Sequence, residues 1–108
     1  MKELPPKIKW DIWYAYVKYE DIADGKIRPV IIAEDKAFVL EVLPVYGAPS
    51  DNADYELWDW ADAGLAKPSA VKLSPISVQP SDFERRIGRL SIIDIRKIIK
   101  LLAAPKII

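Results

Sequence analysis

The chain is built around the stretch Gly25-Lys26-Ile27-Arg28-Pro29-Val30-Ile31-Ile32-Ala33, a basic turn that runs directly into an apolar segment. Its continuous β-branched residues, 30–32, predict a strand that is covered on both faces. Pro29 has no backbone N–H to donate, so it fits the start of that strand. Arg28 is therefore expected at the mouth of a rigid element, where its planar guanidinium suits an anion. The simpler alternative is a solvated cation, or one paired with a nearby acid.

Further strands are predicted on both sides of this stretch. Upstream, segment 7–17 is rich in aromatic and β-branched residues that alternate like a strand. Downstream, the charged turn 34–36 leads to a second apolar run at 37–43, which we expect to form a hairpin with the first. Segment 70–78 is predicted as one later strand, with a bulge or a sheet edge at Pro75.

The chain is expected to close with an amphipathic helix over about 92–103. Ser91 and Asp94 have the spacing of a capping box, in which the hydroxyl accepts from the N3 amide and the acid reaches back. Apolar residues then recur at helical spacing, with basic residues on the other side. Several short strands before one helix predict a mainly β fold, a small SH3-like barrel, because closure removes exposed sheet edges. All 108 residues are expected to form a single domain, 1–108.

Composition narrows the chemistry that is open to this chain. It has no cysteine and no histidine, which removes thiolate metal sites, a cysteine nucleophile and the usual neutral-pH base. The acids of segment 51–62 lack the spacing and the turn glycine of a calcium loop, so we expect a solvated acidic face and no metal or cofactor. Charge is uneven, since residues 1–63 hold 7 basic and 13 acidic side chains while residues 64–108 hold 9 and 3. This asymmetry fits either internal complementarity or a basic face for an acidic partner.

Nothing in the sequence predicts an association with membranes. No apolar run approaches the roughly 18 residues of a membrane span. The N-terminal segment 1–6 lacks the apolar stretch of a signal peptide. We therefore expect a soluble, cytoplasmic protein.

Four blocks of sequence, taken in order, resemble the PemK/MazF family of toxins from type II toxin-antitoxin systems. They are KWDIW at 9–13, GKIRPVII at 25–32, AGLAKPSAVKL at 63–73 and IGRLSIID at 87–94, and the likeness extends from about Lys7 to Leu102. The resemblance implies an SH3-like barrel that acts as a homodimer and cuts single-stranded RNA without a metal. In that reaction a 2′-hydroxyl attacks the neighbouring phosphorus and leaves a cyclic phosphate end. It also implies an antitoxin partner whose acidic tail fills the RNA groove.

The resemblance assigns roles to five residues. Arg28 matches the arginine of the family's Arg-Pro motif, which contacts the scissile phosphate. Tyr46 lies at or next to the position where many members carry a threonine, and this chain has no threonine. Lys72 and Ser74 match a cation and an acid of a later strand, with serine in place of the acid. The implied catalytic residues are Arg28 and Tyr46, and the implied RNA-binding residues are Lys26, Lys72 and Ser74.

Other functions stay open on the sequence alone. The chain could be a non-catalytic SH3-like barrel that binds a peptide or nucleic acid through the same groove. A toxin that acts on a protein target such as gyrase, as in the related CcdB family, has no supporting motif. The basic cluster Arg85, Arg86 and Arg89 could track an RNA backbone, bind an acidic tail or be solvated surface.

Overall fold

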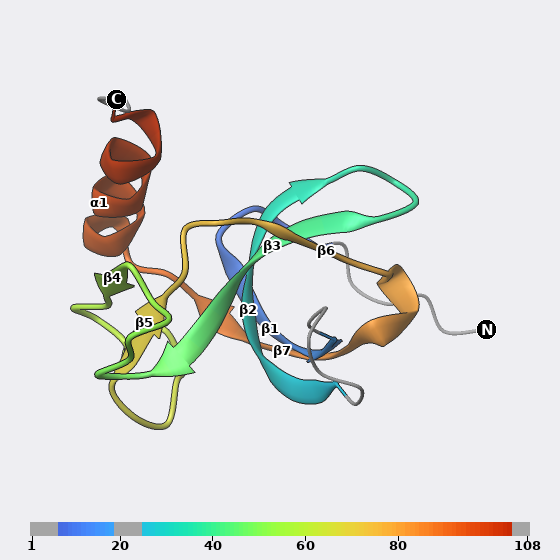
Figure 1. The fold of residues 1–108 in the computed structure, drawn as a ribbon, viewed down its shortest axis with the longest axis horizontal. Coiled ribbons are helices and arrows are strands. Elements are labelled where there is room, and N and C mark those ends of the chain that lie inside the picture. The colour runs from blue at the N-terminus through green and yellow to red at the C-terminus, as the bar shows by residue number, and fades with distance from the viewer. Residues whose placement is uncertain (1–6, 19–24, 105–108) are drawn as a thin grey trace.

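β-Strands dominate the computed structural model of the protein, which describes residues 7–18 and 25–104 (Figure 1). Seven strands form one antiparallel sheet, and a single α-helix follows them. The elements are β1 (Asp11–Val17), β2 (Lys26–Asp35), β3 (Leu40–Gly47), β4 (Tyr55–Glu56), β5 (Ser69–Val71), β6 (Ile76–Val78), the 3-10 turn η1 (Pro80–Asp82), β7 (Phe83–Arg89) and α1 (Ile92–Ala103). The predicted mainly β fold is confirmed, and so is the final helix. Segment 1–6 lies outside the described residues.

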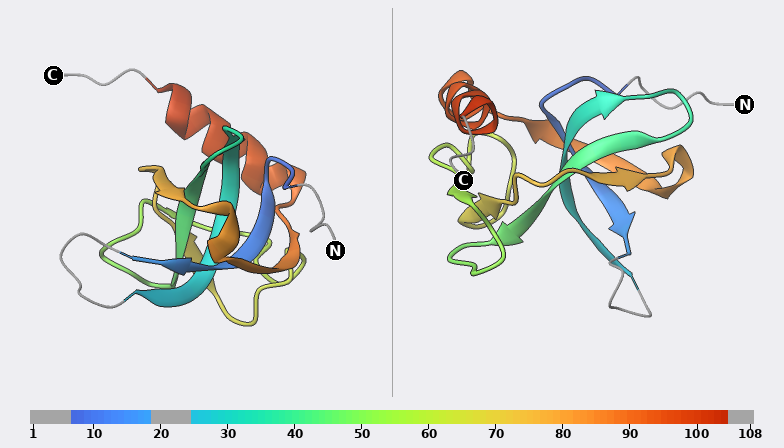
Figure 2. Two further views of the ribbon diagram at one scale, coloured as in Figure 1. Left: turned by 90° about the vertical axis from the view of Figure 1, so that its right-hand side faces the viewer. Right: turned by 45° about the horizontal axis from the view of Figure 1, so that its top comes forward.

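The strands are ordered β4-β5-β3-β2-β1-β7, and β6 pairs with β3 off this path. The sheet is strongly twisted, and α1 lies at the end of the molecule that carries β4 and β5 (Figures 1 and 2). β4 and β7 stand at the two ends of the path, so the described strands form an open sheet rather than a closed one. The predicted hairpin is confirmed, since β2 and β3 pair antiparallel from Val30↔Pro44 to Asp35↔Leu40.

β2 is the strand on which both halves of the core depend. Val30 and Ile32 belong to one buried cluster, whereas Ile31 between them belongs to a second cluster. All three side chains are at most 1% exposed. Burying each contributes about 1.5–3 kcal/mol to stability. The prediction of a strand covered on both faces is therefore confirmed.

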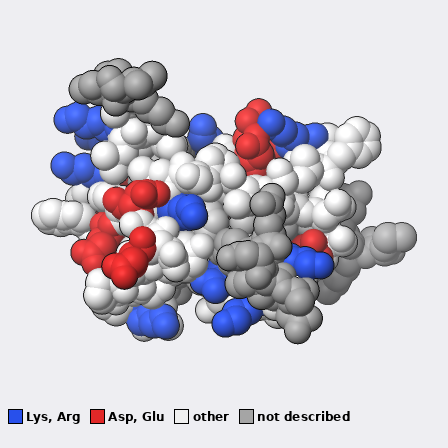
Figure 3. Space-filling view, viewed as in Figure 1, with Lys and Arg blue, Asp and Glu red and all other residues white. Residues whose placement is uncertain are grey.

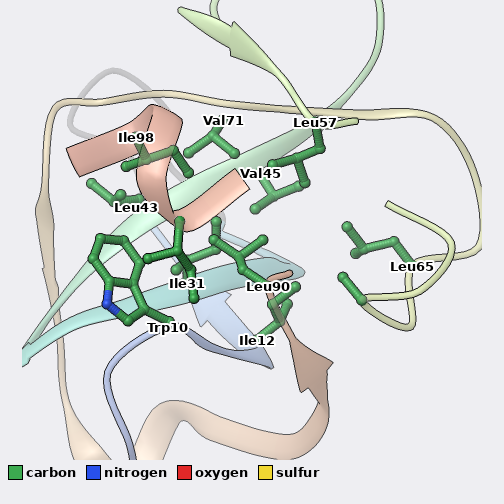
Figure 4. Close-up of a cluster of buried hydrophobic side chains, with 12 residues drawn as sticks. Trp10, Ile12, Ile31, Leu43, Val45, Leu57, Leu65, Val71, Leu90 and Ile98 are labelled. Atoms are coloured by element: carbon green, nitrogen blue, oxygen red, sulfur yellow. The ribbon is translucent and has the colours of Figure 1, made fainter. Parts of the chain in front are cut away.

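The cluster around Ile31 is closed by the helix and the short strands. Figure 4 shows Ile98 of α1 close to Leu43 of β3 and Val71 of β5, with Trp10 and Ile31 on the sheet side of the helix. The other cluster contains Trp13 and Phe83, whose rings pack edge to face with their centroids 6.0 Å apart. β1 and β2 contribute to both clusters, which fixes the register of the strands that carry the candidate site.

Two strand predictions need correction. We expected the strand over 37–43 to end before Pro44, but β3 continues through Pro44 to Gly47. We also expected a single strand over 70–78 with a bulge or a sheet edge at Pro75. The chain forms β5 and β6 instead, and the break between them, 72–75, contains Pro75. β5 pairs with Val45–Gly47 and β6 with Leu40–Val42, so the break lies opposite Pro44. Pro44 accepts from the Lys72 amide but has no N–H to donate in return. Pro75, inside the break, has no N–H either, so a regular ladder does not continue there.

Replacing Gly88 by alanine should destabilise the fold. A Cβ at this position of β7 would lie 2.1 Å from the carbonyl oxygen of Ala63. Backbone must move to relieve that overlap, so we expect the free energy of unfolding to fall by about 1–3 kcal/mol. Urea denaturation followed by circular dichroism measures the change. Gly47→Ala is the control, because its Cβ would approach only the end of the Lys67 side chain, at 3.2 Å. Equal denaturation midpoints for the two variants would contradict this account.

Candidate functional site

Arg28 lines an open hollow of about 300 Å³ that we call the Arg28 hollow. Its walls come from β1, β2, β3 and the segment around 65–69. The polar side chains that line it include Lys26, Tyr46, Lys67 and Ser69. The structure thus brings together three of the five residues that the sequence singled out, namely Arg28, Tyr46 and Lys26.

The centre of the hollow is a contact between Arg28 and Tyr46. The guanidinium carbon of Arg28 lies 4.8 Å from the centroid of the Tyr46 ring. Arg28 is paired with Ala15 of β1, and Tyr46 is paired with Ala70 of β5, so neighbouring strands hold both residues. Both side chains are half-buried. A guanidinium that is stacked on an aromatic ring and anchored on a strand is preorganised for a planar contact with an anion.

Lys67 lies in the block AGLAKPSAVKL at 63–73, but it was not among the predicted site residues. The end of its side chain passes over Gly47, where an added Cβ would come within 3.2 Å of both Cε and Nζ. The Ser69 hydroxyl donates to the Lys67 carbonyl oxygen at 2.8 Å and so ties the turn together. Lys67 and Arg28 are far apart in the sequence, so only the pairing of β3 with β5 brings them to one hollow.

The Arg28 hollow is therefore lined by three cationic side chains, Lys26, Arg28 and Lys67. None of the described residues that line it is acidic. A concave surface with one sign of charge raises the local concentration of oppositely charged ligands. The hollow consequently favours phosphate or carboxylate groups.

Lys72 and Ser74 lie elsewhere. They follow β5 in the break before β6, and the Lys72 amide donates to the Pro44 carbonyl oxygen at 3.0 Å. Neither residue is among those that line the Arg28 hollow.

The three arginines of β7 make two different kinds of contact. Arg86 and Arg89 both contact the buried carboxylate of Asp11, each with a nitrogen–oxygen distance of 3.0 Å. Arg85 instead stacks over the Tyr14 ring, with its guanidinium carbon 4.9 Å from the centroid. Two of the three arginines thus neutralise a buried acid, and Arg85 is the one that lies over Tyr14, a residue that also lines the Arg28 hollow.

Asp94 holds the helix to the acidic segment. Its carboxylate is fully buried and accepts hydrogen bonds from the Tyr55 hydroxyl at 2.7 Å and from the amides of Trp58 and Asp59, both at 2.9 Å. Burial, together with this hydrogen bond, raises the pKa of the Tyr55 hydroxyl. One half of the predicted capping box is confirmed, because the Asp94 amide donates to the Ser91 hydroxyl. The other half is not found, since the carboxylate accepts from Tyr55 of β4 and from two amides of the segment after β4 instead of reaching back to Ser91.

Figure 3 shows one group of acidic side chains around β4 and basic side chains over α1, while acidic and basic side chains lie side by side elsewhere on this face. Within residues 7–18 and 25–104, no group of three or more potential ligand side chains is arranged to hold a metal ion. No helix in the same ranges is long and apolar enough to cross a bilayer.

Comparison with models of known protein families and with curated protein sequences found no match to this chain.

Proposed function

We propose that this chain binds single-stranded RNA in the Arg28 hollow and cleaves it without a metal ion. The observation that supports this most strongly is the stacking of half-buried Arg28 on Tyr46, in a hollow that two further cations line. A stacked guanidinium with neighbouring ammonium groups suits a chain of phosphates that is interrupted by flat bases. The open, twisted sheet with its terminal helix would then be an SH3-like barrel of the PemK/MazF kind.

The reaction would use the cations directly. The 2′-oxygen of the ribose attacks the adjacent phosphorus, a new P–O bond forms, and the bond to the 5′-oxygen breaks. The products are a 2′,3′-cyclic phosphate and a 5′-hydroxyl, and the proton lost by the 2′-hydroxyl balances the one gained by the leaving oxygen. Negative charge grows on the non-bridging oxygens, where Arg28 would stabilise it. Lys26 and Lys67 would hold the flanking phosphates.

A second candidate is binding without cleavage, through the same hollow. It is favoured by one observation: the described residues that line the hollow include neither a carboxylate nor an imidazole to accept the 2′-proton. Binding and cleavage are therefore tested separately, the first of them with RNA that cannot react.

The proposed function also implies an antitoxin partner and a homodimer. As the toxin of a toxin-antitoxin pair, acting in the cytoplasm, the chain would be silenced by an antitoxin whose acidic tail occupies the cationic hollow. A homodimer is supported by α1, on which several large apolar side chains are about half exposed: Ile92, Ile93, Ile99, Leu101 and Leu102. Among them Ile92, Ile99 and Leu102 recur at helical spacing on one side of α1, and an exposed apolar patch of this kind is typical of a protein interface.

The binding step is tested with a fluorescent 2′-O-methyl RNA, which lacks the attacking hydroxyl. We expect binding by wild-type protein to weaken as salt rises, because each phosphate contact displaces counterions. A duplex of the same sequence should bind more weakly, because its bases are not available for stacking. Equal affinity for uncharged peptide-nucleic acid of the same sequence would contradict a phosphate site.

Substitutions of Tyr46 separate the role of its ring from that of its hydroxyl. The ring carries the contact with Arg28. We therefore expect Tyr46→Phe to bind the 2′-O-methyl RNA nearly as well as wild type, and Tyr46→Ala to bind about tenfold more weakly, as the loss of one stacking contact predicts. Fluorescence anisotropy measures both affinities. If Tyr46→Phe is as defective as Tyr46→Ala, the hydroxyl holds the phosphate and the ring is incidental.

A further inference from the structure

A second hollow adjoins the Arg28 hollow. It has a volume of about 380 Å³ and is lined by Tyr14, Ile27, Glu84 and Arg85. We call it the Arg85 hollow. Tyr14 and Ile27 line both hollows, so the two form one continuous surface across β7, β1 and β2. Its volume falls within the range of pockets that bind small ligands.

The Arg85 hollow has a flat wall and an apolar surface. Tyr14 is paired with Arg85 across β1 and β7 and with Pro29 across β1 and β2, so it stands in the middle of three strands. The Arg85 guanidinium lies over the Tyr14 ring. Ile27 is 54% exposed beside them. The register of β1 and β7 shifts just after Tyr14, which leaves Glu84 without a partner on β1 next to Arg85. Planar groups that are anchored on neighbouring strands form a preorganised stacking surface.

The two hollows differ in charge. Lys26, Arg28 and Lys67 line the first, whereas Arg85 and Glu84, one cation and one carboxylate, line the second. A carboxylate repels phosphate, and it accepts hydrogen bonds from amino groups. The second hollow therefore suits a flat, uncharged group that donates hydrogen bonds. In a nucleic acid, that group is a base.

We propose that the Arg85 hollow is a subsite for the base next to the phosphate bound at Arg28, and that it prefers bases with an exocyclic amino group. This inference rests on the proposed binding of RNA. The base stacks on the Arg85 guanidinium, which itself lies over the Tyr14 ring, and Glu84 accepts from the N6 amino group of adenine or the N4 amino group of cytosine. Uracil has a carbonyl oxygen at the corresponding position, which faces the carboxylate unfavourably.

The test uses fluorescent 2′-O-methyl homopolymers of adenine, cytosine and uracil of equal length, with affinities measured by anisotropy. We expect wild-type protein to bind the adenine and cytosine polymers roughly tenfold more tightly than the uracil polymer, which corresponds to one good base contact. Glu84→Ala should remove the preference. Glu84→Gln should keep part of it, because the amide oxygen still accepts although the charge is gone. Arg85→Ala should weaken binding of all three polymers, and Arg96→Ala, which removes an exposed cation of α1, should not.

The outcomes separate this inference from the proposed function. If Glu84→Ala keeps the wild-type preference, the base subsite is wrong, while wild-type binding that weakens as salt rises would still support RNA binding. If wild-type protein binds none of the three polymers, both proposals are wrong. Binding of polyglutamate in that case would assign the hollows to an acidic protein partner.

Discussion

Replacement of Arg28 by alanine should reduce RNA cleavage by roughly 10²–10³-fold, the effect of removing one preorganised group that stabilises transition-state charge. Arg28 lies near the start of β2, and its guanidinium is already stacked on the Tyr46 ring. The Arg28 side chain therefore does not have to become ordered when substrate binds. The effect should appear mainly in the rate of the chemical step, since Lys26 and Lys67 still line the hollow and hold flanking phosphates. Single-turnover cleavage of a labelled single-stranded RNA measures that rate.

Two control variants make the result specific. Arg28→Lys keeps the charge but loses the planar fork, so it should retain an intermediate rate. Arg96→Ala removes one exposed cation from α1 and should cleave like wild type. If Arg96→Ala slows cleavage as much as Arg28→Ala, net charge rather than the geometry at Arg28 controls the reaction.

Replacement of Asp94 by alanine should lower the free energy of unfolding by about 3–5 kcal/mol, a larger loss than we expect for Gly88→Ala. The substitution leaves the Tyr55 hydroxyl and the amides of Trp58 and Asp59 without their acceptor, and each unsatisfied donor costs about 1–3 kcal/mol. It also removes the hydrogen bonds that join the start of α1 to the segment after β4. Urea denaturation monitored by tryptophan fluorescence measures the change.

Asp62→Ala is the matched control, because that acid is exposed in the same segment. We expect its unfolding midpoint to stay close to that of wild type. Tyr55→Phe removes only one of the three donors and should cost about 1 kcal/mol. An Asp94→Ala variant as stable as Asp62→Ala would show that the carboxylate does not hold the two segments together.

Local patterns in the sequence were enough to predict β2 and α1. The run 30–32 is apolar at every position because the two core clusters lie on opposite faces of β2, and that is the pattern of a doubly covered strand. Helix α1 has a hydroxyl at its N-cap and apolar residues at helical spacing, so its bounds could be read directly. These elements depend on short-range signals.

The rest of the site depends on contacts between distant residues. Lys67 reaches the Arg28 hollow only through the pairing of β3 with β5, and no local pattern encodes that pairing. The three arginines of β7 look alike in the sequence, but the buried carboxylate of Asp11 engages only Arg86 and Arg89. Asp94 has the spacing of a capping box, yet its carboxylate has three tertiary donors within reach. In each case a long-range partner determined the role.

The central claim is that the Arg28 hollow binds and cuts single-stranded RNA with no metal ion. The most direct measurement is incubation of the purified protein with labelled single-stranded RNA in excess EDTA, followed by analysis of the fragment ends. The account predicts fragments with 2′,3′-cyclic phosphate and 5′-hydroxyl ends, formed by wild-type protein and roughly 10²–10³-fold more slowly by Arg28→Ala. RNA that stays intact with protein in excess, or fragments that form equally with Arg28→Ala, would contradict it.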